Sequence, residues 1–244
     1  MTYSKRPMTS SHITRTTVLG ALTQMTYILL FLLLGVGLVL LTQYVLAGAS
    51  LYLHNPATAQ KASWYGIRAA GLTSYTLLWL STLMGLLVTA RWLPQRVRAL
   101  VAWHEMVSLA ALLFLGWHVL ALYMDSYMSV TWWQPLLPFA VSSYRPVALA
   151  WGQIGAYLMV AIILSFYVRR YIGGKRWRQL HYLTMVLYGL ALLHAVTAGS
   201  DVAYMPVRIF YGITGSTILM LVYSRMFTHK AGKRSRAQRK PSGA

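Results

Sequence analysis

Four histidines lie in long apolar stretches of this 244-residue sequence, His104 and His118 in one stretch and His181 and His194 in another. Ionisable side chains are costly inside a bilayer, so histidines placed there indicate a functional site. Neutral imidazole is a good ligand for iron and other transition metals. The absence of cysteine excludes disulfides, thiolate-ligated clusters and haem attached through cysteine. We expect the remaining histidines to be solvated or interfacial: His12, His54 and His229.

The spacing within each stretch predicts how these histidines meet. His104 and His118 are 14 residues apart, and His181 and His194 are 13 residues apart. At about 1.5 Å per helical residue, the two members of each stretch are roughly 20 Å apart along the axis. Parallel helices would therefore pair His104 with His181 at one depth and His118 with His194 at another. Each pair can supply the two axial imidazoles of a b-type haem.

Helical geometry agrees with this arrangement for the first stretch and not for the second. Fourteen residues make four turns less about 40°, so His104 and His118 share a helix face. Thirteen residues fall about 140° short of four turns, so the second helix needs a bulge or a tight turn, for which Gly189 is a plausible place. We also expect Gly116 and Gly189 to open space for a haem.

Membrane-spanning helices must hold these histidines. Hydrophobic residues make up 57% of the chain and charged residues only 10%, about half the charge of a soluble domain. The predicted fold class is all-α, a polytopic membrane protein whose six transmembrane helices form a dihaem b-type bundle. It divides into a basic N-terminal segment (1–24), the helical domain (25–227) and a basic, disordered tail (228–244). Six apolar stretches are long enough to cross a bilayer: Met25–Leu46, Ala69–Ala90, Leu100–Tyr123, Val147–Val168, Leu180–Ala198 and Met205–Phe227.

The basic residues predict the orientation in the membrane. Lys and Arg number 22 against three acidic residues, which gives a net charge of +19. Most of them fall in the termini and loops on one side, so the positive-inside rule puts both termini in the cytoplasm. We expect the membrane to be a bacterial inner membrane. Because this charge lies between apolar runs, we expect contact with anionic lipid and no binding of nucleic acid. Alternatively the first helix is a cleaved signal peptide, since Ala47-Gly48-Ala49 resembles a cleavage site.

Three arginines are further candidates for binding a cofactor. Arg176 and Arg178 lie in the basic run before His181, and Arg68 lies where the topology predicts the outer surface. Each could pair with a haem propionate. The alternative is ordinary positive-inside charge and lipid contact for Arg176 and Arg178, and interfacial anchoring for Arg68.

From about Gly71 to Phe227, the chain resembles the ferric reductase-like transmembrane domain. Ferric reductases, NADPH oxidases and the membrane subunit of the bacterial methionine sulfoxide reductase system share this domain. The resemblance rests on the two histidine spacings, in the third and fifth of six helices, and on the lead-in Lys-Arg-Trp-Arg-Gln-Leu-His that ends at His181. It implies an inner haem b on His104 and His181, an outer haem b on His118 and His194, and electron transfer across the membrane.

Departures from this family pattern bear on the partners. The oxidases and the eukaryotic ferric reductases carry a flavin domain after the sixth helix, whereas about 17 residues follow here. We therefore expect no flavin on this chain and a separate flavin reductase or quinol as the electron donor. Quinone is a further candidate cofactor. We expect the acceptor to be a redox partner or another acceptor on the outer side. The oxidases' extra histidine in the third helix is Leu122 here, and the nearest aromatic residue between the fifth-helix ligands is Tyr188. The chain would be an oxidoreductase subunit without catalytic residues of its own.

Two other functions stay open from the residues. One is a cytochrome b-type subunit of a quinol-oxidising complex, which a quinone pocket and stable partners would distinguish. The other is a haem-free proton or metal transporter subunit whose histidines relay protons or bind metal. Glu105, the one acidic residue within the six stretches, lies near a helix end. This scarcity of carboxylates argues against the transporter.

Overall fold

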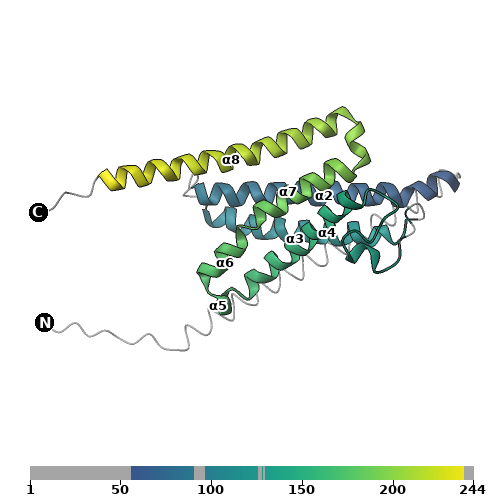
Figure 1. Cartoon of the computed structure of the whole chain (residues 1–244), viewed down its shortest axis with the longest axis horizontal. Coiled ribbons are helices and arrows are strands. Elements are labelled where there is room, and N and C mark those ends of the chain that lie inside the picture. The colour runs from purple at the N-terminus through teal and green to yellow at the C-terminus, as the bar shows by residue number, and fades with distance from the viewer. Residues whose placement is uncertain (1–55, 91–96, 126–127, 129, 239–244) are drawn as a thin grey trace, which may run out of the picture. The chain divides into compact units, whose positions relative to one another are not determined.

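The computed structural model describes residues 56–90, 97–125, 128 and 130–238. Throughout these residues the regular secondary structure is helical (Figure 1). The predicted all-α class is therefore confirmed for this part of the chain. The first predicted span, Met25–Leu46, and the signal-peptide alternative lie outside the described residues.

Five of the described segments are long and apolar enough to cross a membrane. The long helices are α2 (Pro56–Ala90), α3 (Val97–Leu122), α4 (Pro146–Tyr167), α7 (Thr184–Ala198) and α8 (Met205–Gln238). The short ones are η2 (Gln134–Leu136), α5 (Arg169–Ile172), α6 (Gly174–His181) and η3 (Ser200–Ala203). The five spans are Ser63–Thr89, Val97–Leu122, Pro146–Tyr167, Gly174–Ala198, which joins α6 to α7, and Met205–Arg225.

Two helices extend beyond the predicted apolar stretches. α2 begins at Pro56, ahead of the predicted start at Ala69, and α8 continues to Gln238. The segment 228–238, predicted to be disordered, is therefore helical. It is rich in Ala, Lys, Arg and Gln, which are strong helix formers, so a helix that is already nucleated in the membrane can propagate through it.

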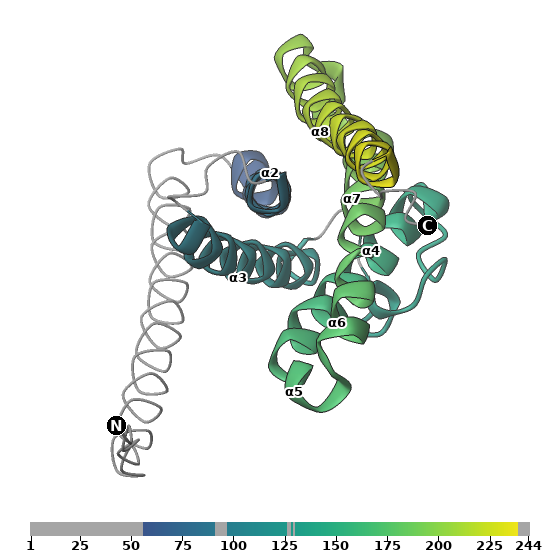
Figure 2. The ribbon, with the colours of Figure 1, turned by 90° about the vertical axis from the view of Figure 1, so that its left-hand side faces the viewer.

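Packing is organised around two helix pairs, α2 with α3 and α4 with α7 (Figure 2). The helices of each pair are antiparallel, because contacts join the start of one to the end of the other. α8 contacts both α2 and α7. The buried centre lies where α2, α7 and α8 meet. There the Tyr75 hydroxyl is 3.0 Å from the Tyr188 hydroxyl and 2.7 Å from Thr214 Oγ1. These hydroxyls satisfy one another's hydrogen bonds in an interior that offers no water.

Hydrogen bonds join the residues before α4 to the last turn of α7. Arg145 has a left-handed backbone (φ 38°), and Pro146 at the first helical position follows it. The Tyr144 hydroxyl donates to the Ala198 carbonyl at 2.8 Å, and Arg145 Nη1 donates to the Thr197 carbonyl at 2.6 Å. These side chains satisfy carbonyls that the last turn of α7 leaves without a partner.

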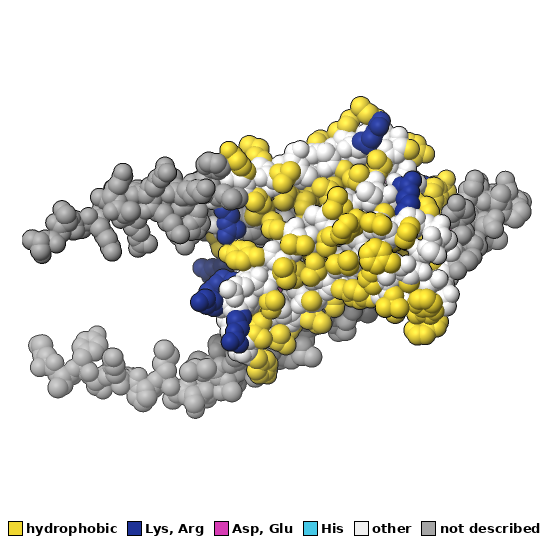
Figure 3. Space-filling view, in the orientation of Figure 1, with side chains coloured by type: hydrophobic (Ala, Val, Ile, Leu, Met, Phe, Trp, Pro, Cys, Tyr) yellow, Lys and Arg dark blue, Asp and Glu magenta, His cyan; other side chains and the backbone are white. Residues whose placement is uncertain are grey.

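The surface has the distribution of a membrane protein. On the face shown in Figure 3, hydrophobic side chains cover the middle, and Lys and Arg gather toward the two ends. Large apolar side chains are exposed along the spans, including Leu164 at 58% and Met220 at 75%. Such exposure is stable when lipid surrounds the helices. The protein is therefore an integral membrane protein.

Candidate functional site: two pairs of facing histidines

The structure brings the four intramembrane histidines together as two pairs. The inner pair, named after the predicted topology, is His104 of α3 with His181 at the end of α6, whose ring centroids are 6.0 Å apart. The outer pair is His118 of α3 with His194 of α7, whose ring centroids are 6.2 Å apart. The ring planes cross at 81° in the inner pair and 80° in the outer pair.

A tight turn between α6 and α7 aligns the second helix. The backbone N–H groups of Tyr182, Leu183 and Met185 donate to carbonyls three residues earlier, at 3.0–3.2 Å. Three residues per turn advance the chain by roughly 20° more per residue than an α-helix, so this turn recovers part of the missing rotation of about 140°. The turn therefore lies just after His181, whereas Gly189 lies inside regular α7.

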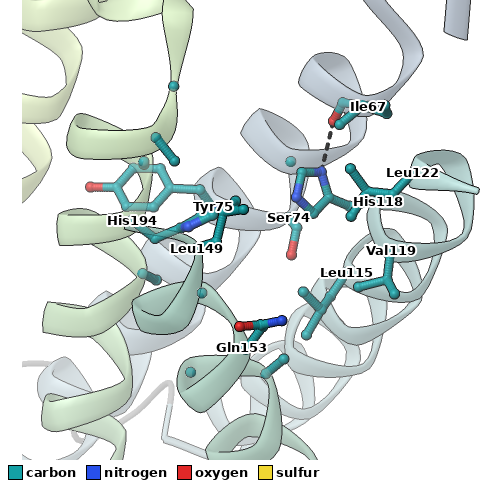
Figure 4. Close-up of a pocket in the computed structure, with 18 of the residues that line it drawn as sticks. Ile67, Ser74, Tyr75, Leu115, His118, Val119, Leu122, Leu149, Gln153 and His194 are labelled. Carbon is teal, nitrogen blue, oxygen red and sulfur yellow. Dashed lines mark hydrogen bonds between the residues drawn. The ribbon is translucent and has the colours of Figure 1, made fainter. Parts of the chain in front are cut away.

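Three of the four histidines donate a hydrogen bond to a backbone carbonyl of a neighbouring helix. Since a carbonyl can only accept, Nδ1 carries the proton, and Nε2 is left with a lone pair for a ligand bond. Figure 4 shows one of these bonds, from His118 to Ile67. The distances are 2.8 Å from His104 to the Ser81 carbonyl, 2.8 Å from His118 to the Ile67 carbonyl, and 2.9 Å from His194 to the Ala148 carbonyl.

A glycine lies four residues after each accepting carbonyl. A Cβ at Gly71 would lie 2.9 Å from His118 Nδ1, and one at Gly152 would lie 2.6 Å from His194 Nδ1. At Gly85 it would lie 3.3 Å from His104 Cε1. Only a residue without a side chain lets the imidazole reach the carbonyl one turn earlier. We call each such carbonyl and glycine a cradle.

The cradles repeat with the spacing of the histidines that they hold. Ile67 and Ser81 are 14 residues apart in α2, as are Gly71 and Gly85. His104 and His118 in α3 have the same separation, and α2 runs antiparallel to α3, so one helix offers two equivalent cradles at the two depths. These glycines were not predicted from the sequence, although the matching interval was a signal that could have identified them.

A cavity of about 290 Å³ lies beside the outer pair, and its lining includes both His118 and His194. Figure 4 shows that apolar side chains such as Leu115, Leu149 and Val119 surround these histidines. Gln153 also lines the cavity, and its Nε2 donates to three carbonyls of the η2 region. The walls are therefore suited to a large apolar molecule that lies between the two histidines, His118 and His194.

The donor set fits an iron whose remaining ligands come from a macrocycle. The described residues contain no group of three or more His, Cys, Asp or Glu side chains able to hold a metal ion, and a bare zinc site usually takes at least three protein ligands. A haem iron needs only two axial ligands. Two imidazoles bound at about 2.0 Å, with each ring centre about 1.1 Å behind its nitrogen, would have centroids roughly 6.2 Å apart. The two observed separations match that value.

The structure places the other predicted site residues in different surroundings. Arg68 forms an ion pair with Asp201, its Nε lies 2.8 Å from that carboxylate, and its guanidinium lies 4.1 Å from the Trp64 ring centre. Arg68 and Asp201 line the outer cavity. Arg176 and Arg178 are exposed on α6. Neither of the glycines expected to make room for a haem contacts a histidine: a Cβ at Gly116 or Gly189 would meet nothing within 4 Å.

The fold and this site define a class: an all-α integral membrane protein with paired histidines at two depths.

Two curated relatives match the chain. Magnetosome protein MamZ of Magnetospirillum gryphiswaldense is 26% identical over 146 residues, which cover 59% of this chain and 21% of MamZ. The MamZ of Paramagnetospirillum magneticum is 25% identical with the same coverage. The matching region is thus about a fifth of the length of these relatives. No family model and no solved structure matches the chain.

Proposed function

We propose that the chain is a transmembrane electron-transfer subunit of the ferric reductase-like type, which binds two b-type haems through His104/His181 and His118/His194. The observation that carries this proposal is the facing of imidazoles at two depths, with a spacing that fits an iron between each pair. Haem b, held by His104 and His181 at one depth and by His118 and His194 at the other, would supply one-electron chemistry.

The side chains and backbone have distinct tasks under this proposal. The carbonyls of Ile67, Ser81 and Ala148 hold three imidazoles in the ligand-ready tautomer and raise their donor strength. The apolar lining of the outer cavity excludes water, which favours electron transfer over side reactions with solvent. Tyr75 and Tyr188 are buried between the two histidine pairs, and the contact between their hydroxyls joins α2 to α7 at the centre of the bundle.

The partners follow from the charges at the two ends. α5 and α6 carry exposed basic side chains, which include Arg176 and Arg178, and α6 ends at His181. We propose this end as the cytoplasmic one, where a separate flavin reductase or quinol delivers electrons and where anionic lipid gathers. The acceptor would be reached from the end that holds Arg68 and Asp201. We propose a bacterial inner membrane as the location, in keeping with the bacterial origin of the relatives.

The test is the haem content of the detergent-purified full chain, measured as pyridine haemochrome together with a reduced-minus-oxidised spectrum. We expect two b-type haems per chain, and about one in His118→Ala or His104→Ala. His229→Ala, which removes a histidine outside the two pairs, should keep both. A well-folded wild-type protein that takes up no haem would refute the proposal.

A further inference from the structure

The inner pair is asymmetric, because His181 lacks the cradle that the other three histidines have. In the described part of the chain, no backbone carbonyl accepts a hydrogen bond from its ring. α4 holds His194 through the Ala148 carbonyl and Gly152. The equivalent positions 14 residues further along α4 are Ile162 and Phe166.

Both equivalent positions are closed to an imidazole. The Ile162 carbonyl accepts a hydrogen bond from Ser165 Oγ at 2.6 Å, so its free lone pair is already used. Phe166 carries an aromatic ring where a cradle needs a glycine. That ring packs against Trp177 of α6, with centroids 6.2 Å apart, and the Arg169 guanidinium covers it at 4.1 Å. The place of the missing cradle is therefore filled by an aromatic stack.

Trp177 continues this stack onto the histidine. Its ring lies 5.2 Å from the His181 ring with an angle of 27° between the planes, so the two rings are nearly parallel. The buried Trp177 Nε1 has no hydrogen-bond partner among the described residues, and the indole contacts the rings of Phe166 and His181. Two rings that stack resist rotation of either about its side-chain bonds, since rotation would open a gap on one side.

We propose that Trp177 is the positioning residue for His181, replacing the carbonyl and glycine that orient the other three histidines. This inference rests on the proposed function, because the orientation of the ring matters through the metal that it binds. The stack fixes the plane of the His181 ring, and with it the 81° crossing with His104. In the outer pair, two hydrogen bonds fix the corresponding angle.

The angle between axial imidazole planes has a spectroscopic signature. Nearly perpendicular planes give a highly anisotropic low-spin ferric signal in electron paramagnetic resonance, whereas nearly parallel planes give an ordinary rhombic signal. The test uses the oxidised, haem-loaded full chain and three variants. Trp177→Leu removes the stacking ring, and Trp177→Phe keeps a flat one. Trp79→Leu is the matched control, because Trp79 also has a buried, unpartnered Nε1 among the described residues and packs on a phenylalanine, Phe210.

We expect two highly anisotropic signals in the wild type. In Trp177→Leu, the signal that is also absent from His104→Ala should become rhombic or disappear, while the other signal stays unchanged. Trp177→Phe and Trp79→Leu should retain both signals. The inference is overturned if Trp177→Leu keeps both signals, or if Trp177→Phe changes the spectrum as much as Trp177→Leu does. A wild type without haem would overturn the proposed function itself, so the two failures are distinguishable.

Discussion

Gly152→Ala tests the cradle where the structure leaves least room. The added methyl group would lie 2.6 Å from Nδ1 and 2.7 Å from Cε1 of His194, whereas ordinary contacts begin near 3.4 Å. The imidazole would have to move by roughly 0.8 Å to restore an ordinary separation. The bond from His194 to the Ala148 carbonyl, now 2.9 Å, would then exceed hydrogen-bonding distance.

The expected magnitude follows from the loss of that bond. Removing the group that orients a metal-bound histidine typically weakens metal binding about 10- to 100-fold, or roughly 1.4–2.7 kcal/mol. We therefore expect Gly152→Ala to lose most of the outer haem while it keeps the inner one. Gly85→Ala should have a smaller effect, because its methyl group would lie 3.3 Å from His104 Cε1.

The assay is a titration of the purified, haem-depleted protein with haem, followed by the absorbance of the bound form and by haem per chain. Gly189→Ala is the control, because a methyl group there meets nothing within 4 Å and alanine favours a helix over glycine. A Gly152→Ala variant that binds two haems with the affinity of Gly189→Ala would refute the role of the cradle.

Three further predictions concern residues outside the cradles. Arg68→Ala and Asp201→Ala should each lower the melting temperature, because each single change leaves one charge of a partly buried pair unmatched. The double variant should lower the melting temperature by much less than the sum of the two single losses. Additive losses would contradict the pairing. Tyr75→Phe should destabilise the protein by about 1–2 kcal/mol, since its hydroxyl contacts two others, and should leave the haem spectrum intact; an unchanged melting temperature would count against the hydrogen bonds. Arg176→Glu should slow reduction of the haem-loaded protein by a soluble flavin reductase several-fold at low salt and little at high salt. Arg208→Glu, at the other end of the helices, should not slow it. Equal effects of the two substitutions would argue against docking at α6.

Hydropathy predicted most of the helical structure. The apolar stretches predicted five of the described spans, because a bilayer imposes a minimum length and polarity on any segment that crosses it. The start of α2 at Pro56 and the extension of α8 to Gln238 were not predicted. Hydropathy does not register a polar segment that continues a helix already formed.

Residue order along the chain was enough to place four histidines within membrane helices and to give their intervals, since a helix converts residue number into depth and direction. Which groups hold those rings depends on how the helices pack against one another. The cradle at Gly152 exists because α4 packs against α7, and the stack on Trp177 exists because Phe166 fills the equivalent place at the other depth. Backbone carbonyls are the same in every residue, so their use as hydrogen-bond acceptors depends on which helices meet and at what rotation. No pattern along one helix specifies that.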